Sequence, residues 1–81
     1  MDLLDVVIRE RGREVFKGKA YAVSGTNEIG PFDILFNHAN FVAKVREKIT
    51  IHSDKNSKKD FIIEEGIIHV KENLVEVFLG I

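Results

Sequence analysis

Apolar and polar residues alternate along much of the chain, a period of two that is typical of β-strands with one buried face. The clearest stretch runs from residue 43 to residue 52. One of its faces is apolar and the other is polar, with Ala43, Val45, Ile49 and Ile51 on the first and Lys44, Arg46, Lys48, Thr50 and His52 on the second. Glu47 falls in the apolar row, which predicts a bend or a β-bulge at that position.

Turn-forming residues recur at intervals that leave room for strands and not for helices. They lie at Gly12, Gly18, Gly25, Gly30-Pro31, Asn37, Asp54 to Lys59, Gly66 and Asn73. The polar run 52–60 predicts a mobile hairpin loop, and the run 71–73 predicts a tight turn that tolerates positive φ. We therefore predict an all-β fold, a flattened antiparallel β-sandwich of about eight to ten short strands, because two sheets packed face to face bury every apolar face.

Length and composition describe one small domain, residues 1–81, with no linker or repeat. The chain has no cysteine, which excludes disulfides, a thiolate nucleophile and cysteine metal sites. Its 12 Lys and Arg residues nearly balance 13 Asp and Glu residues, so the net charge gives no long-range attraction to nucleic acid or anionic lipid. The acidic N-terminus does not fit a signal peptide, and no apolar run approaches about 20 residues, so any membrane contact is expected to be indirect.

The case for catalysis or metal binding rests on three histidines, His38, His52 and His69. They lack zinc-ligand spacing, and no serine has the context of a nucleophile elbow. Asp33 and His38 lie around one turn and could act as an orienter and a base; the alternative is that Asp33 caps the turn and that His38 bonds the backbone or meets a partner. The run 25–30 lacks the lysine and the helix of a P-loop, so it predicts a turn. We expect no catalytic residue, no cofactor and no metal.

Large hydrophobic residues in or beside turns favour protein binding, because they are costly there unless another surface covers them. Ile29, Phe36 and Phe41 are such residues. For Phe36, a partner contact and packing on the open end of the sandwich are both open. A single-stranded nucleic-acid binder is a further alternative, and it would need an exposed aromatic ring among the basic residues of the stretch 43–52.

The run Gly30-Pro31-Phe32-Asp33-Ile34-Leu35-Phe36-Asn37-His38-Ala39-Asn40 resembles the signature of the epsilon subunit of rotary ATP synthase. Further matches follow in family order at compatible spacing: Leu4-Asp5-Val6-Val7, Val15-Phe16-Lys17-Gly18, Val23-Ser24-Gly25, Phe61 to Val70 and Asn73 to Val77. The chain also departs from the family. Phe36 and Asn40 stand where the family usually has prolines, and Arg46-Glu47 replaces a usual Pro-Gly turn.

In that family the sandwich clamps onto the central shaft (gamma) subunit and rests against the polar loops of the proton-driven c-ring. The resemblance therefore implies a non-catalytic rotor subunit that couples ion flow to ATP synthesis. By position it implies a ring-facing interface at Asn27, Glu28, Ile29, Gly30 and Pro31 and a shaft-facing interface at His38, Ala39, Asn40 and Phe41.

The resemblance further implies a peripheral place at the cytoplasmic face of an energy-transducing membrane, with membrane contact only through the c-ring. Family members commonly continue into a two-helix C-terminal domain, whereas the sequence ends at Ile81. We expect no C-terminal helical hairpin within these 81 residues, and no self-inhibition unless the natural protein is longer than this sequence. A stand-alone β-sandwich interaction module is the alternative to the rotor subunit.

Overall fold

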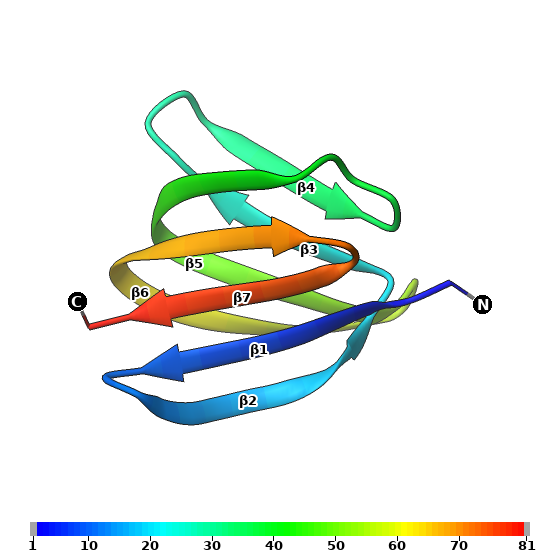
Figure 1. Cartoon of the computed structure of the whole chain (residues 1–81), viewed down its shortest axis with the longest axis horizontal. Helices are drawn as coiled ribbons and strands as arrows, with labels where there is room; N and C mark the ends of the chain where they lie inside the picture. Colours follow the sequence, from blue (N-terminus) through cyan, green and yellow to red (C-terminus); the bar gives the residue numbers. More distant parts are fainter. Residues whose placement is uncertain (1, 81) are drawn as a thin grey trace.

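The computed structural model describes residues 2–80, and within that range all regular structure is β-strand (Figure 1). The strands are β1 (Leu4–Glu10), β2 (Arg13–Ala20), β3 (Ala22–Thr26), β4 (Pro31–Leu35), β5 (Phe41–Asp54), β6 (Ser57–Lys71) and β7 (Leu74–Leu79). They form a seven-stranded sheet in the order β2-β1-β7-β6-β5-β3-β4. Neighbours pair antiparallel except β1 and β7, which pair parallel.

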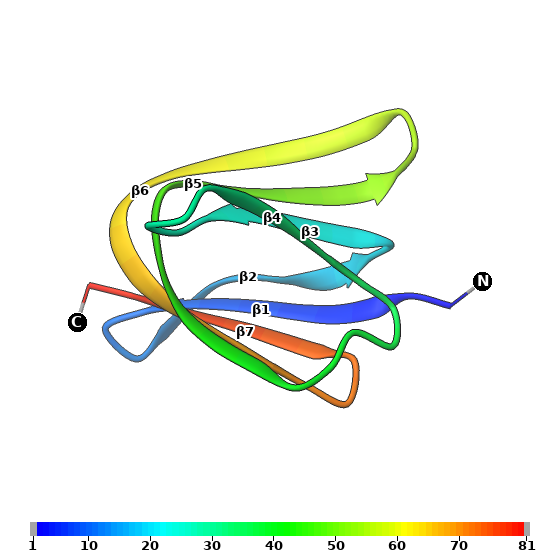
Figure 2. The same cartoon turned by 90° about the horizontal axis from the view of Figure 1, so that it is seen from above.

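A bend in the two longest strands converts this sheet into a sandwich (Figure 2). The register of β5 against β6 shifts between Arg46 and Glu47, because Arg46 pairs with Glu65 whereas Glu47 pairs with Ile63. Glu47 has a φ of 72°, so the predicted bulge is confirmed, and its extra residue is Glu64 on β6. The first layer contains β2, β1, β7, the C-terminal half of β6 and the N-terminal half of β5. The second layer contains the other halves of β6 and β5, together with β3 and β4.

The two layers enclose a core of branched aliphatic side chains. Its fully buried members come from all seven strands: Leu4, Val6, Ile8, Ala20, Val23, Ile34, Val45, Ile49, Ile51, Ile68, Val70, Val75 and Val77. Phe rings close the margins of this core. The rings of Phe16 on β2 and Phe61 on β6 meet edge to face with centroids 5.5 Å apart, which joins the two layers along one side.

The all-β sandwich is confirmed, but it has fewer strands than the eight to ten predicted, because β5 and β6 of 14 and 15 residues each pass through both layers. The predicted loop 52–60 is wrong in extent. Strand pairing continues to Asp54 and resumes at Ser57, and the Asp54 carboxylate accepts the Asn56 amide at 2.8 Å to close the short turn.

Three of the predicted turn glycines lie inside strands instead. At Gly25 the ring of its cross-strand partner Phe32 covers the backbone, and an added Cβ would lie 2.9 Å from that ring. Gly18 is covered by Phe16 in the same manner, and Gly66 lies at the bend of β6. Each of these glycines makes room for an aromatic ring or a neighbouring strand. The spacing of glycines in a sequence does not distinguish this role from a place in a turn.

Candidate functional site: two partner-facing surfaces

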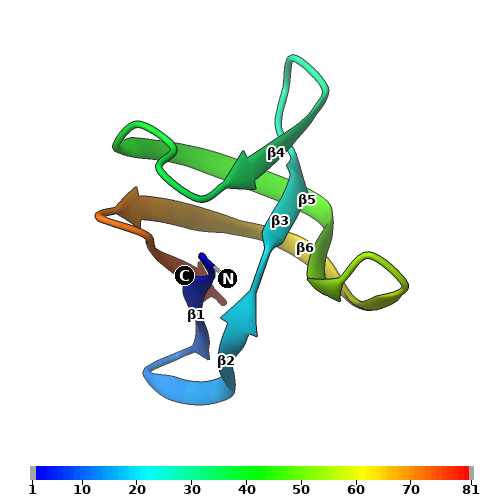
Figure 3. The same cartoon turned by 90° about the vertical axis from the view of Figure 1, so that its right-hand side faces the viewer.

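The predicted ring-facing segment forms the tip of the β3–β4 hairpin, which projects beyond the neighbouring strands (Figure 3). Asn27 and Gly30 exchange backbone hydrogen bonds of 3.0 and 3.2 Å. The Asn27 side-chain oxygen also accepts the amides of Ile29 at 2.9 Å and Gly30 at 3.2 Å. An asparagine that bonds the backbone two residues onward fixes a turn, so this tip is held by its own first residue.

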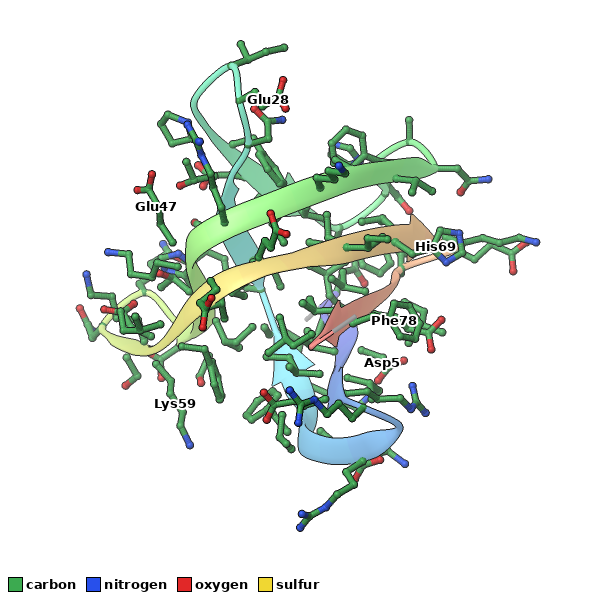
Figure 4. The ribbon with its side chains drawn as sticks, turned by 90° about the vertical axis from the view of Figure 1, so that its left-hand side faces the viewer. Asp5, Glu28, Glu47, Lys59, His69 and Phe78 are labelled. Atoms are coloured by element: carbon green, nitrogen blue, oxygen red, sulfur yellow. The ribbon has the colours of Figure 1, made fainter. Side chains whose placement is uncertain are left out.

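Glu28 and Ile29 stand at the end of this turn, and Figure 4 shows Glu28 pointing away from the body of the sandwich. The Ile29 side chain is 97% exposed. A hollow of about 280 Å³ lies beside it, lined by residues 27–29 together with Ala43 and Lys44 of β5. An isoleucine held on a fixed turn with no intramolecular cover presents apolar surface that suits a partner.

The predicted shaft-facing segment connects β4 with β5 and includes the first residue of β5. The Phe41 ring packs edge to face on Phe32 at 5.4 Å and on His38 at 5.6 Å. Phe41 also packs against the core, while Ala39 and Asn40 are exposed. In this segment the backbone, Ala39 and Asn40 face solvent, while the Phe41 side chain packs between the segment and the core.

An asparagine of the β6–β7 turn ties this segment to the sandwich. The Asn73 side-chain oxygen accepts the Asn37 amide at 2.6 Å, and its backbone oxygen accepts the Asp5 amide at 2.9 Å. Glu72 and Asn73 have φ values of 51° and 65°, so the tight turn with positive φ is confirmed. Three segments far apart in the sequence thus form one rigid corner.

The outer face of the first layer continues from this corner and was missed by the sequence interpretation. We call it the β6–β7 face; its apolar members are Val42, Ile67, Leu74 and Phe78. Val42 is 64% exposed and pairs with His69, while Ile67 pairs with Phe78 on the neighbouring strand. The alternation of these strands predicts an outward position for each residue, and the outward apolar side chains were the available signal.

Charged groups cross the same β6–β7 face. Arg9 Nη1 lies 3.0 Å from Glu76 Oε2, and His69 Nδ1 lies 4.0 Å from Glu76 Oε1. In Figure 4, His69, Phe78 and Asp5 project from β6, β7 and β1 toward the same side. This surface combines half-exposed apolar groups with one Arg–Glu ion pair, a mixture that a non-permanent protein interface can also have.

The β3–β4 tip and the corner of the β4–β5 and β6–β7 turns lie apart, whereas the β6–β7 face reaches back to the hollow beside Ile29, because Lys44 lines that hollow and pairs with Ile67. The β3–β4 tip is at the end of the molecule opposite the β4–β5 and β6–β7 turns (Figures 1 and 2), and the longest extent of the molecule is 33 Å. Hydrogen-bonded strands connect the two ends. A force applied at one end is therefore transmitted through strands rather than through a flexible loop.

The profile of a protein family described as "ATP synthase, Delta/Epsilon chain, beta-sandwich domain" matches residues 3–79. The chain belongs to this family. It is 30% identical over 76 residues to the ATP synthase epsilon chain of Xanthomonas campestris (strain B100), which covers 93% of this chain and 53% of that protein. It is 31% identical over 74 residues to the epsilon chain of Stenotrophomonas maltophilia (strain K279a), with 90% and 51% covered. The chain thus spans about half the length of the curated relatives it matches.

Two solved structures share the fold of this ATP synthase delta/epsilon domain. One is the Euglena gracilis mitochondrial ATP synthase, OSCP/F1/c-ring in rotational state 1, with a TM-score of 0.88 at 13% identity and 98% of this chain and 51% of that chain covered. The other is the Tetrahymena thermophila mitochondrial ATP synthase central stalk/c-ring, with a TM-score of 0.76 at 15% identity and 95% and 63% covered.

The structure separates the pair Asp33 and His38 that was considered for acid–base chemistry. Asp33 accepts the Ser24 hydroxyl across the strands at 2.6 Å, so it does not cap the turn. His38 Nδ1 lies 2.6 Å from the Ala39 carbonyl, so this histidine bonds the backbone. Within residues 2–80 no three His, Asp or Glu side chains gather closely enough to hold a metal ion, and no helix there could cross a membrane.

The bend also divides the basic residues that a nucleic-acid site would combine. Lys44 and Arg46 precede Glu47 and belong to the first layer, whereas Lys48 and His52 follow it in the second. The ring of Tyr21 lies beside His52, with centroids 5.9 Å apart. The row of cations that alternation predicts is therefore two smaller groups on different faces.

Proposed function

We propose that this chain is a non-catalytic central-stalk subunit of a proton-translocating ATP synthase. It joins the central shaft (gamma) subunit to the c-ring and supports the coupling of ion flow to ATP synthesis. Membership of the delta/epsilon family supports the complex. The observation that supports a joining role is that the β3–β4 tip and the corner at the β4–β5 turn are exposed at opposite ends of one hydrogen-bonded sandwich.

The shaft subunit binds at the corner formed by His38, Ala39 and Asn40 and on the adjoining β6–β7 face. This assignment adds Val42 to the predicted segment and gives Phe41 a supporting place beneath it. The contact area needs such an extension, because specific protein interfaces take about 800 Å² from each partner, more than four residues supply.

The c-ring binds at the β3–β4 tip, where Ile29 provides the apolar contact and Glu28 provides charge. Residues Asn27, Gly30 and Pro31 fix the shape of the tip. The chain sits peripherally at the cytoplasmic face of the membrane through the ring. A rotor subunit needs surfaces that fit its partners and a rigid fold between them, and neither property requires a catalytic group.

Titration calorimetry against the purified shaft subunit tests this proposal, with Val42→Arg as the interface variant. Ile62→Arg is the matched control, because Ile62 is 81% exposed on the other layer. We expect saturable one-to-one binding by the unchanged chain and by Ile62→Arg, and a loss of at least tenfold for Val42→Arg, since burying an unpaired charge costs more than about 1.4 kcal/mol. Absence of binding by the unchanged chain would favour a stand-alone interaction module instead.

A further inference from the structure

A hollow on the outer face of the second layer belongs to neither partner-facing surface. It has a volume of about 320 Å³ and lies over β3, β4, β5 and β6, where Ser24, Thr26, Asp33, Lys48, His52 and Lys58 contribute to its lining. These four strands lie side by side in Figure 3. The hollow is open to solvent, and most of its lining residues have polar side chains, so it can take a small hydrated ligand.

The acidic groups around the hollow already accept hydrogen bonds from hydroxyls. Ser24 Oγ lies 2.6 Å from Asp33 Oδ1 and 2.8 Å from His52 Nε2. The hydroxyl has one hydrogen, so when it donates to Asp33 the contact with His52 requires Nε2 to be the donor. Thr50 is nearly buried and donates to Asp60 at 2.7 Å.

The two lysines of the hollow keep open donors. Lys48 and Lys58 stand close enough to Asp60 that, after the hydrogen bond from Thr50, their charges help to lower the pKa of that carboxyl. Yet within the part of the chain that the structure describes, neither ammonium lies within 4.0 Å of a carboxylate. Each therefore retains N–H groups for an external anion.

We propose that this hollow binds a phosphate group, either free or as a phosphate monoester, between Lys48 and Lys58. Lysine binds phosphate as a compact point charge. The carboxylates beside the two lysines, Asp33 and Asp60, balance their charge, but each already accepts a hydroxyl hydrogen bond, so the ammonium groups are the donors left for an anion. The hydroxyl of Thr26 lies within the same lining. The Ser24–His52 pair forms a hydrogen-bonded wall whose proton positions are set before a ligand arrives.

A second hollow adjoins this site and could receive the organic part of an ester. It has a volume of about 580 Å³ and is lined by Tyr21 and residues 54–57. The rings of Tyr21 and His52 lie 5.9 Å apart, and the Tyr21 amide donates to the His52 carbonyl at 3.0 Å. Free phosphate and an ester therefore differ in whether they contact Tyr21.

Amide chemical-shift titrations with sodium phosphate and with phenyl phosphate, at neutral pH and constant ionic strength, test the site. We expect saturating shifts at Ser24, Thr26 and Lys48. Lys48→Gln and Lys58→Gln should each weaken phosphate binding roughly tenfold, the effect of losing one charge-assisted hydrogen bond. Lys17→Gln and Lys71→Gln change exposed lysines of β2 and β6 and should leave Kd unaltered.

The phenyl phosphate titration identifies the form of the ligand. Tighter binding than phosphate, lost in Tyr21→Leu, would assign the site to an ester; equal binding would assign it to the free anion. Chemical shifts that never saturate, or one Kd shared by all four lysine variants, would overturn the proposal. Either result would mean that phosphate only screens the charges of surface lysines in general. Because the titration uses the isolated chain, its result does not depend on whether the shaft or ring binds.

Discussion

Gly66 lies in the middle of β6 and has no room for a side chain. It pairs with Val45 on one side and with Leu79 on the other. A Cβ at this position would lie 2.6 Å from the Phe78 carbonyl oxygen and 2.7 Å from Leu79 Cδ2. The bend of β6 brings the end of β7 against its backbone, so the glycine permits two strands to approach at the point where the layers separate.

Gly66→Ala should therefore destabilise the fold by about 1–3 kcal/mol, the usual cost of an overpacked site. The neighbouring Glu65 is exposed, and Glu65→Ala should change the free energy of unfolding by less than about 0.5 kcal/mol. Urea unfolding of the two variants measures the difference. Equal stability would mean that β7 shifts freely, and would contradict the close packing at the bend.

The hydroxyl of Thr50 stabilises the charged form of Asp60. This hydrogen bond, followed by the charges of Lys48, Lys58 and His52, lowers the pKa of the carboxyl below its ordinary 3.8, while desolvation acts in the opposite direction. A carboxyl whose pKa is lower in the folded state than in the unfolded state adds to the free energy of unfolding. This contribution is complete at pH values above the unfolded-state pKa, and it is lost as the pH falls through the folded-state pKa.

In Thr50→Val the pKa of Asp60 should rise toward its ordinary value, because the largest cause of the shift is gone. The stability difference between the unchanged chain and the variant should narrow as pH falls below about 4. Carboxyl carbon NMR of Asp60 across the acid range measures the first effect. A pKa that stays the same in the variant would show that the lysine charges alone hold it low.

The bend in β5 and β6 is the element that gives the family's sandwich its form here. Glu47 adopts a positive φ where β-branched residues are strongly disfavoured. Alternation identified this position because a charged residue interrupts an apolar row. It did not show that β5 passes from one layer to the other at this bulge, because that depends on long-range pairing.

Glu47→Val should destabilise the domain by about 1–2 kcal/mol relative to Glu47→Gly, because a left-handed conformation costs about that much for a residue with a Cβ. Both variants remove the same charge, so each serves as the control for the other. Thermal unfolding followed by circular dichroism provides the comparison. A Val variant as stable as the Gly variant would indicate that the backbone relaxes away from the positive φ.

The polar hairpin between β5 and β6 shows where composition misleads. The run from His52 to Asp60 has no large apolar residue, so it was interpreted as a mobile loop. Its strands are nonetheless paired, with His52 opposite Lys58 and Thr50 opposite Asp60. Backbone hydrogen bonds and cross-strand polar contacts maintain them, neither of which depends on an apolar face.

At the scale of the whole molecule, strand alternation and the family signature were sufficient to predict the sandwich and its class. The turn predicted over 25–30 is confirmed as the connection between β3 and β4, while the two interfaces at 27–31 and 38–41 stay predictions. Alternation and the signature could not show that Phe41 turns inward or that Val42, Ile67 and Phe78 share a face, because cross-strand register decides both. Register depends on long-range pairing, which a local pattern leaves open.

The central claim is that one rigid domain connects two partners through separate ends, and retention of the shaft subunit on an immobilised c-ring tests it most directly. The unchanged chain should increase retention of the shaft subunit. Ile29→Asp should bind the shaft but fail on the ring, and Val42→Arg should bind the ring but fail on the shaft. If the chain leaves retention unchanged, or if both variants lose the same partner, the account of a domain that joins shaft and ring is contradicted.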